Sequence, residues 1–419
     1  MLSVHSIALL CSFCILCVAA NSSASNIDKS KTLLTPKQTR TRTFSKSNQP
    51  FQRTPLSNLP SLKNDLLLLA ATNTKTSRVP VWCMRQAGRH LPEFRALTNE
   101  GYDFFTMCQI PELAVEISLQ PLRRYGVDAV IIFSDILVIP QAMGMEIKMV
   151  NGVGPVFTHP LDSPEDISKL GLDLHPNVED KLGYVMDAIN LARIEIQGQV
   201  PLIGFCGGPL SLLMFMVEGQ SSKSFTKLKK WLYNYPNECH MILKSLANIC
   251  VEFLVAQQRT GAQVLQVFES VGVEGLTRDQ YYEFVLPYLS DIAERVKGAC
   301  SDTPLIVFSK GTDYAFEKLA ETKFDCLGVD FTSDPEDIRR RIAGSGKALQ
   351  GNMDPCCIYG DNERIENEVE KMLHRFGSNG GYIANLGHGC LPDMDPEHVD
   401  VFIKSVQKKS LNTFGASDQ

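Results

Sequence analysis

Short apolar runs recur along most of the chain, and each is followed by polar or glycine-rich residues and then by a segment with helical periodicity. Continuous apolar runs of this kind are typical of strands that are buried on both faces of a parallel sheet. Eight of them occur, at 80–84, 129–133, 201–205, 264–268, 305–309, 326–330, 348–352 and 382–386. Amphipathic stretches such as 228–254 and 363–376 are long enough for crossover helices. The repeat predicts an α/β fold in which eight β/α units close as a single (β/α)8 TIM-type barrel.

The residues before this repeat have a different pattern. Residues 7–20 form an apolar run that ends in Val18-Ala19-Ala20, which is typical of a signal peptide with its cleavage site. Residues 21–58 hold 13 Ser and Thr and are basic, as in an organellar transit peptide. We therefore expect a signal-peptide-like segment at 1–20, a disordered transit-peptide-like segment at 21–58, the barrel at 59–410 and a flexible tail at 411–419.

This two-part leader indicates a destination. A signal peptide followed by a transit peptide is the address of a plastid bounded by extra membranes, with mitochondrial import and secretion as the alternatives. No run of 18 apolar residues follows the leader, so we expect no stable membrane insertion of the mature chain.

The net charge and the spacing of the cysteines argue against several classes of function. The leader holds seven of the 41 basic residues and one of the 47 acidic residues, which leaves a net charge of about −12 on the rest of the chain. So acidic a body argues against a nucleic-acid partner. Outside the apolar leader no C-x-x-C pair occurs among the 13 cysteines, so neither a metal site nor a redox dithiol is predicted.

Residues that carry chemistry follow the predicted strands, where the active site of a barrel forms. Arg85 and Arg89 follow the first run four positions apart, and two guanidinium groups on one side suit a ligand with several carboxylates. Salt bridges at the barrel rim are the alternative. Asp135 follows the second run and stands beside Ile136, where an ionised carboxylate needs a partner. Alternatively, it caps the following helix.

Two further residues are candidates of the same kind. Ser270 follows the fourth run, either as a site residue or as the N-cap of the next helix, and His388 stands between two glycines after the eighth run. Nucleotide-binding, zinc-protease and nucleophile-elbow motifs are absent from the sequence. The residues thus offer positioned arginine, aspartate and histidine without an evident cofactor.

These same segments resemble the uroporphyrinogen decarboxylase family from about residue 59 to residue 410. Five motifs carry the resemblance, in family order: PVWCMRQAGRHLPEFR at 80–95, IFSDILVIP at 132–140, VEG at 217–219, LQGNMDP at 349–355 and YIANLGHGCLPDMDPEHV at 382–399. The resemblance implies a carboxy-lyase that needs no cofactor and no metal. It would convert the four acetate side chains of uroporphyrinogen III to methyl groups, giving coproporphyrinogen III for haem or chlorophyll synthesis, and would act as a homodimer.

The resemblance also implies residue roles. Asp135 is similar to the carboxylate that receives the pyrrole N–H groups. Arg85 and Arg89 resemble the arginines that hold substrate carboxylates and assist proton delivery, and Ser270 and His388 resemble substrate contacts. Phe215 stands where the family usually has a substrate-binding Tyr.

Other departures from the family pattern are milder. His90 and Leu391 also replace Tyr, and Leu210-Ser211 replaces a common Trp-Thr pair. Two alternatives remain: a tetrapyrrole-binding homologue without activity, and a corrinoid-dependent methyltransferase on the same barrel, which would use zinc.

Overall fold

The computed structural model describes residues 51–150, 153–377 and 381–414. The signal-peptide-like segment and most of the transit-peptide-like segment therefore lie outside the described residues. The strands are β1 (Val130–Ile131), β2 (Ile147–Val150), β3 (Gly154–Phe157), β4 (Leu202–Gly207), β5 (Val264–Glu269), β6 (Leu305–Ser309), β7 (Cys326–Gly328), β8 (Ala348–Met353) and β9 (Tyr382–Leu386).

Helices account for most of the other described residues. In the first half they are η1 (Leu56–Asn58), α1 (Leu66–Ala71), α2 (Pro92–Asn99), α3 (Phe104–Gln109), α4 (Pro111–Tyr125), α5 (Val138–Ala142), α6 (Glu165–Lys169), α7 (Val178–Ile196) and α8 (Pro209–Glu218). In the second half they are α9 (Thr226–Asn234), α10 (Pro236–Thr260), η2 (Val273–Gly275), α11 (Arg278–Phe284), α12 (Leu286–Ala299), η3 (Asp313–Ala315), α13 (Phe316–Ala320), α14 (Pro335–Arg341), η4 (Pro355–Tyr359), α15 (Asn362–Phe376) and α16 (Pro396–Phe414).

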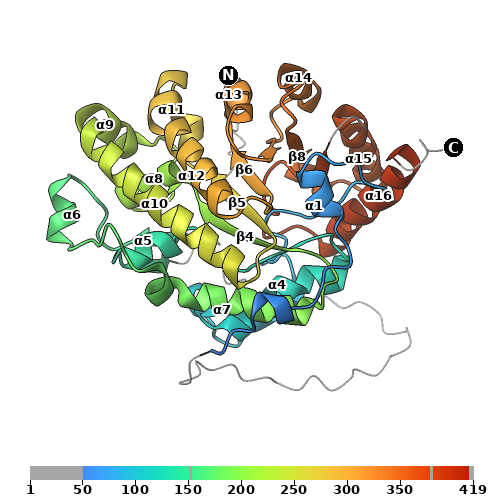
Figure 1. Ribbon diagram of the computed structural model, residues 1–419, viewed down its shortest axis with the longest axis horizontal. Helices are drawn as coiled ribbons and strands as arrows, with labels where there is room; N and C mark the ends of the chain where they lie inside the picture. The colour runs from blue at the N-terminus through green and yellow to red at the C-terminus, as the bar shows by residue number, and fades with distance from the viewer. Residues whose placement is uncertain (1–50, 151–152, 378–380, 415–419) are drawn as a thin grey trace, which may run out of the picture.

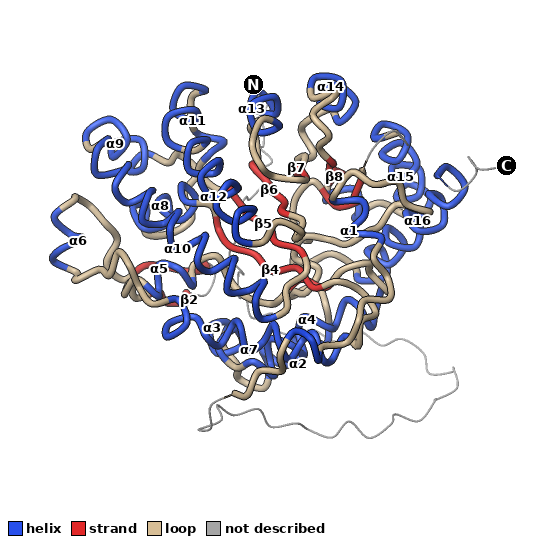
Figure 2. Tube along the Cα trace, viewed as in Figure 1, coloured by secondary structure: helices blue, strands red, loops and turns tan. Residues whose placement is uncertain are grey.

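Seven strands form one parallel sheet in the order β1-β4-β5-β6-β7-β8-β9. The sheet curls at the centre of the molecule and helices surround it (Figures 1 and 2). Nearly every side chain of β5, β6 and β9 is buried, as expected for strands covered on both faces. The fold is therefore the α/β barrel that the repeat of apolar runs predicts.

The first predicted strand, at 80–84, is the exception. It is not a strand but a single bridge between Val81 and Ala384. Pro80 has no N–H, and the N–H of Val81 donates to the side chain of Asp128 (2.9 Å), so a regular ladder cannot form. The segment still closes the barrel, because Ala384 N–H donates to Pro80 O (2.9 Å) and Asp128 N–H donates to Val81 O (2.8 Å). It thus occupies the eighth position, between β9 and β1.

Other elements refine the prediction from periodicity. The amphipathic stretch at 228–254 is divided between α9 and α10, because Tyr235 precedes Pro236 and takes a non-helical conformation. β2 and β3 form an antiparallel hairpin outside the barrel sheet, which the apolar runs do not predict.

Helix α10 is long and apolar enough to cross a membrane by length and composition. In the described residues it lies against β4, β5, α7 and α12, and two thirds of its most apolar window is buried. Its apolar surface is therefore largely covered by the protein itself.

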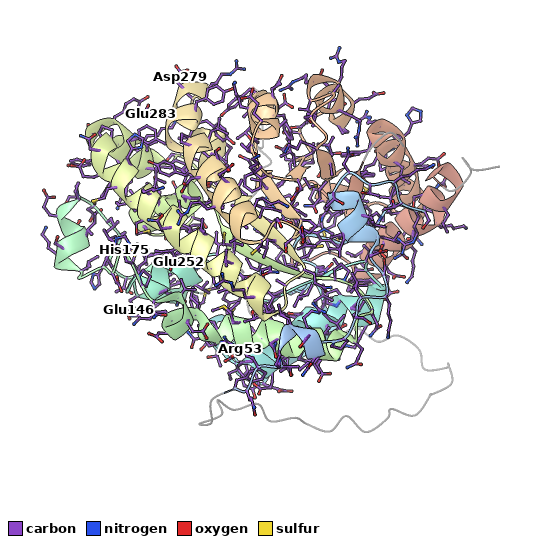
Figure 3. The ribbon with its side chains drawn as sticks, viewed as in Figure 1. Arg53, Glu146, His175, Glu252, Asp279 and Glu283 are labelled. Atoms are coloured by element: carbon purple, nitrogen blue, oxygen red, sulfur yellow. The ribbon has the colours of Figure 1, made fainter. Side chains whose placement is uncertain are left out.

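The described chain begins before residue 59, the expected start of the barrel. Arg53 lies beside α7 (Figure 3), where its guanidinium pairs with Glu179 (2.6 Å) and Asp187 (2.7 Å). The next residue, Thr54, exchanges two hydrogen bonds with Asn190. Residues 53 and 54 are thus fixed on the barrel. At the other end, α16 continues to Phe414, past the expected boundary at 410.

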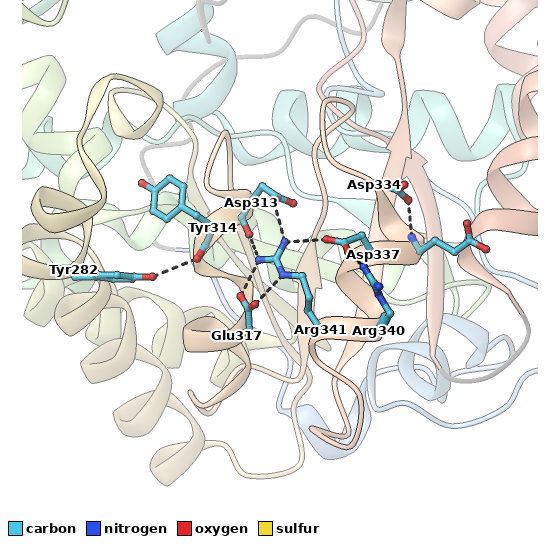
Figure 4. A network of polar contacts seen from close by, with 9 residues as sticks. Tyr282, Asp313, Tyr314, Glu317, Asp334, Asp337, Arg340 and Arg341 are labelled. Atoms are coloured by element: carbon cyan, nitrogen blue, oxygen red, sulfur yellow. Dashed lines mark hydrogen bonds and ion pairs between the residues drawn. The ribbon is translucent and has the colours of Figure 1, made fainter.

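A polar network joins neighbouring helices of the outer layer (Figure 4). Arg341 of α14 binds Glu317 of α13 through both carboxylate oxygens (2.8 and 2.7 Å) and Asp313 at 2.9 Å. Arg341 is the main reason that the pKa of Glu317 falls to about 2. The network ties the loop after β6 to the helix after β7.

Candidate active site

A cavity opens at the carboxyl ends of the barrel strands. Most of its wall is apolar, formed by isoleucines and Phe133 in β1 and the turn after it, and by one phenylalanine each from β4, β5 and β6. The empty space is about 1040 Å³ when the solvent at its open mouth is included. The lining suits a ligand with an extended apolar face.

Four of the six predicted site residues line this one cavity: Arg85, Arg89, Asp135 and His388. They come from three separate segments, which follow the first closing segment, β1 and β9. The barrel therefore brings together residues that are up to 303 positions apart in the sequence.

The position of Arg85 is set by its backbone and by a glycine. Arg85 has a φ of 59°, in the left-handed region that non-glycine residues rarely adopt. The loop after β9 is joined to the same segment, because Cys390 N–H donates to Met84 O (2.9 Å). A Cβ at Gly389 would stand 2.4 Å from Cδ of Arg85. Only glycine at 389 lets the Arg85 side chain follow this path.

Asp135 lies in the turn between β1 and α5. Its Oδ1 accepts a hydrogen bond from Leu137 N–H (2.7 Å), the local contact that Asp commonly makes in turns. Among the described residues, Oδ2 has no hydrogen-bond partner. Burial raises the pKa of Asp135 to about 6, against the opposing effects of Leu137 N–H and the charge of Arg85. The turn thus presents a carboxylate that is ionised at neutral pH but poorly solvated.

The histidines of the site are neutral at physiological pH. Burial, followed by the charges of Arg85 and Lys310, holds the pKa of His388 well below its ordinary value. His90 also lines the cavity, and burial lowers its pKa to about 4. Both rings can therefore donate one hydrogen bond and accept another.

The remaining two predicted residues do not line this cavity. Ser270 is buried in the loop after β5, and its Oγ has no hydrogen-bond partner among the described residues. It is not a helix N-cap, because η2 begins after Gly272. Phe215, which the sequence assigns to the strand-three segment, is fully buried in α8 instead.

The sequence did not predict the aromatic wall of the cavity. Phe268 and Phe308 are register partners on β5 and β6, and Phe205 contacts Phe268 edge to face at 5.6 Å. All three line the cavity near the ends of their strands. Because these strands are apolar on both faces, alternation gives no signal of which Phe points inward.

A metal would need several ligands close together. Within the described ranges, no group of three or more His, Cys, Asp or Glu residues could hold a metal ion.

The fold and this cavity define a class of protein: a β/α-barrel enzyme that combines a half-buried carboxylate with two arginines over an apolar wall. Residues 62–409 match the family model described as "Uroporphyrinogen decarboxylase (URO-D)". The chain therefore belongs to the uroporphyrinogen decarboxylase family.

Curated relatives carry the same name over nearly their whole length. The chain is 50% identical to uroporphyrinogen decarboxylase of Danio rerio, with 84% of this chain and 95% of that protein covered. It is 45% identical to the Salinibacter ruber protein (85% and 98%) and 47% identical to the Homo sapiens protein (84% and 95%).

A solved structure supports the fold alone. A methyltransferase from Methanosarcina mazei aligns with a TM-score of 0.69 at 20% identity, over 83% of this chain and 98% of that one.

Proposed function

We propose that this protein converts uroporphyrinogen III to coproporphyrinogen III by removing carbon dioxide from four acetate side chains. The observation that carries the proposal is the match of residues 62–409 to the decarboxylase family, with the motif residues Arg85, Asp135 and His388 on one cavity. The lining of the cavity suits this substrate, because the pyrrole rings of the macrocycle would meet the aromatic wall while its carboxylates meet the arginines.

Asp135 acts on the macrocycle. Decarboxylation needs an electron sink, which forms when a pyrrole ring is protonated on carbon. The bond between the acetate methylene and its carboxylate then breaks, carbon dioxide leaves, and a proton adds to the exocyclic carbon to complete the methyl group. The ring carbon then gives up the proton that it took, which restores the pyrrole. A carboxylate about 4 Å from the pyrrole cation stabilises it by about 4 kcal/mol at an effective dielectric constant of 20, or about 10³ in rate. Oδ2 of Asp135 is available to accept the pyrrole N–H groups.

The arginines act on the side chains of the substrate. Arg85 and Arg89 bind acetate or propionate carboxylates, to which guanidinium groups can donate two parallel hydrogen bonds. Their positive charge also favours delivery of a proton from solvent to the neighbouring carbon. His388, which is neutral, donates to a propionate carboxylate. The substrate contacts that the resemblance implies for Ser270 and Phe215 stay predictions, because neither residue lines the cavity.

The test is direct. The protein is incubated with uroporphyrinogen III without oxygen, and the products are oxidised and separated by their number of carboxylates. We expect the four-carboxylate product and, on the way, species with seven to five carboxylates. Binding of the macrocycle without any loss of carboxylates would contradict the proposal and support a binding protein. Zinc content of the purified protein, measured in parallel, tests the methyltransferase alternative.

We also propose that the leader carries the chain into a plastid, as its signal-like and transit-like halves suggest. A fluorescent fusion of residues 1–59 that enters plastids would support this, and one that stays in the cytosol or leaves the cell would contradict it. We propose further that the enzyme is a homodimer, which light scattering would test by a mass twice that of the chain.

A further inference from the structure

Glu269, the last residue of β5, is fully buried and is not part of the cavity wall. Its carboxylate lies at the start of α8. Oε1 accepts hydrogen bonds from Ser211 N–H (2.6 Å) and from the Ser211 hydroxyl (2.5 Å), and Oε2 accepts one from Leu210 N–H (3.1 Å). An acidic group at a helix N-terminus satisfies amides that have no partner within the helix.

The backbone around this carboxylate is built to admit it. A Cβ at Gly208 would stand 2.4 Å from Oε2 of Glu269, so any other residue there would displace the carboxylate or the helix. Pro209 follows at the first helical position, where no N–H needs an acceptor. The two N–H groups that remain to be capped are those that Glu269 takes.

Ser211 connects Glu269 to the loop that contains Ser270. While its proton is donated to Glu269, its oxygen accepts hydrogen bonds from Ser270 N–H (3.0 Å) and Val271 N–H (3.1 Å). These two bonds fix the backbone of the loop that begins the turn after β5. They therefore fix the backbone from which the Ser270 hydroxyl projects, and this hydroxyl is buried and has no partner among the described residues.

We infer that Glu269 and Ser211 are positioning residues for the decarboxylation, which fix the backbone of Ser270 in the loop after β5 through a chain of hydrogen bonds. The inference rests on the proposed function for the role of Ser270, but not for the hydrogen bonds themselves. Neither residue contacts the reacting atoms. A carboxylate is required because it has only acceptors, whereas an amide at 269 would set an N–H against Leu210 N–H or the Ser211 hydroxyl.

One matched pair of substitutions, one further variant and one control separate the hydrogen bonds from other effects. Ser211→Thr keeps the hydroxyl and Ser211→Val has the same shape without it, so their difference isolates the hydrogen bonds. Glu269→Gln changes the acceptor set at constant size. Ser245→Val is the control, because Ser245 is another buried serine whose hydroxyl donates to a backbone carbonyl, Leu174 O.

Hydrogen–deuterium exchange of the full chain tests the positioning without reference to activity. Measured at pH 8, the amides of Ser270 and Val271 should exchange about tenfold faster in Ser211→Val than in Ser211→Thr. Glu269→Gln should have a similar effect and Ser245→Val none. Equal exchange in Ser211→Val and Ser211→Thr would overturn the inference.

Turnover tests whether the position of Ser270 is what matters. Ser270→Ala should lower kcat/KM by about 3- to 10-fold, and Ser211→Val should fall below Ser211→Thr by a similar factor. In the Ser270→Ala background, the difference between Ser211→Val and Ser211→Thr should shrink below about twofold. If Ser211→Val lowers kcat/KM by the same factor with Ser270→Ala present as without it, the two residues act independently. That result would contradict positioning through Ser270. If the unmodified protein shows no turnover, the proposed function fails, while the exchange experiment still decides whether Ser211 holds the loop.

Discussion

The side chain of Arg85 passes directly over Gly389, so that a Cβ at position 389 would stand 2.4 Å from Cδ and 2.8 Å from Nε of the arginine. Two segments more than 300 residues apart thus fix one guanidinium at the cavity. The glycine has a steric role here that is separate from any conformational freedom, because its φ does not lie in the left-handed region.

Gly389→Ala should therefore lower activity while leaving the fold intact. The added methyl group pushes the Arg85 side chain off its path, and loss of a charged hydrogen bond to a substrate carboxylate costs about 1.5 to 3 kcal/mol, or about 12- to 150-fold in kcat/KM. Gly298→Ala is the control, because nothing lies within 4 Å of a Cβ there. Steady-state kinetics that gave both variants the wild-type kcat/KM would show that the path of Arg85 is unimportant.

Asp135→Asn should remove activity and add stability. The amide is nearly isosteric but lacks the charge that the pyrrole cation requires, so we expect less than about a tenth of the wild-type rate. Burial raises the pKa of Asp135 from 3.8 to about 6, so ionisation costs the folded state about 1 to 3 kcal/mol at pH 8. Thermal unfolding at pH 8 should then occur a few degrees higher in the variant.

This stability effect depends on pH, because the pKa of Asp135 is higher in the folded protein than in the unfolded chain. Between pH 4 and pH 6 the folded wild-type protein binds a proton at Asp135 that the unfolded chain has lost, so the destabilising effect of Asp135 fades as the pH falls. The stability advantage of Asp135→Asn should be largest above pH 7 and should vanish near pH 4. An advantage of equal size at pH 4 and pH 8 would point to packing and not to charge.

The activity of the wild-type enzyme should depend on the same ionisation. Only the carboxylate can accept pyrrole N–H groups, so kcat/KM should rise as the pH passes about 6 and then level off. His388, whose pKa lies well below its ordinary value, and His90, with a pKa of about 4, do not titrate in that window. A profile without an inflection near pH 6 would contradict the role of the Asp135 ionisation.

Phe215 is the departure from the family that most invites an interpretation as loss of function. Phe215→Tyr should raise the rate by at most about tenfold, because the hydroxyl restores one neutral hydrogen bond of about 0.5 to 1.5 kcal/mol. Fewer intermediates with seven to five carboxylates should accumulate. Phe215 is fully buried, so a hydroxyl without a partner would instead lower the unfolding temperature. A gain of about 10³ in rate would show that the hydroxyl is essential.

Several elements of the fold could be predicted from the sequence because their physics is local. The apolar runs at 305–309 and 382–386 coincide with β6 and β9, which are buried on both faces. The run at 80–84 looks the same in sequence, but its ladder is interrupted by the Asp128 carboxylate, which also pairs with Arg78 at 2.6 Å. That contact joins residues 50 positions apart, and no local pattern reports it.

The functional residues also include some that the sequence predicts and some that it does not. Arg85, Asp135 and His388 could be found because each follows an apolar run, and a barrel gathers such residues at one end. The network of Glu269 and Ser211 could not, because a Glu after a strand and a Ser in an apolar helix carry no signal of their contact. The location of Phe215 on α8 likewise depends on where the strand-three segment turns into a helix.

The central claim is that this chain removes carboxylates from uroporphyrinogen III by means of the charge of Asp135. The most direct measurement is the amount of carbon dioxide released per macrocycle at pH 8, by the wild-type protein and by Asp135→Asn side by side. We expect the wild-type protein to release four molecules of carbon dioxide for each macrocycle that it converts. The variant should release carbon dioxide at less than about a tenth of the wild-type rate. Equal rates in the two proteins, or no release above the protein-free control in either, would contradict the account.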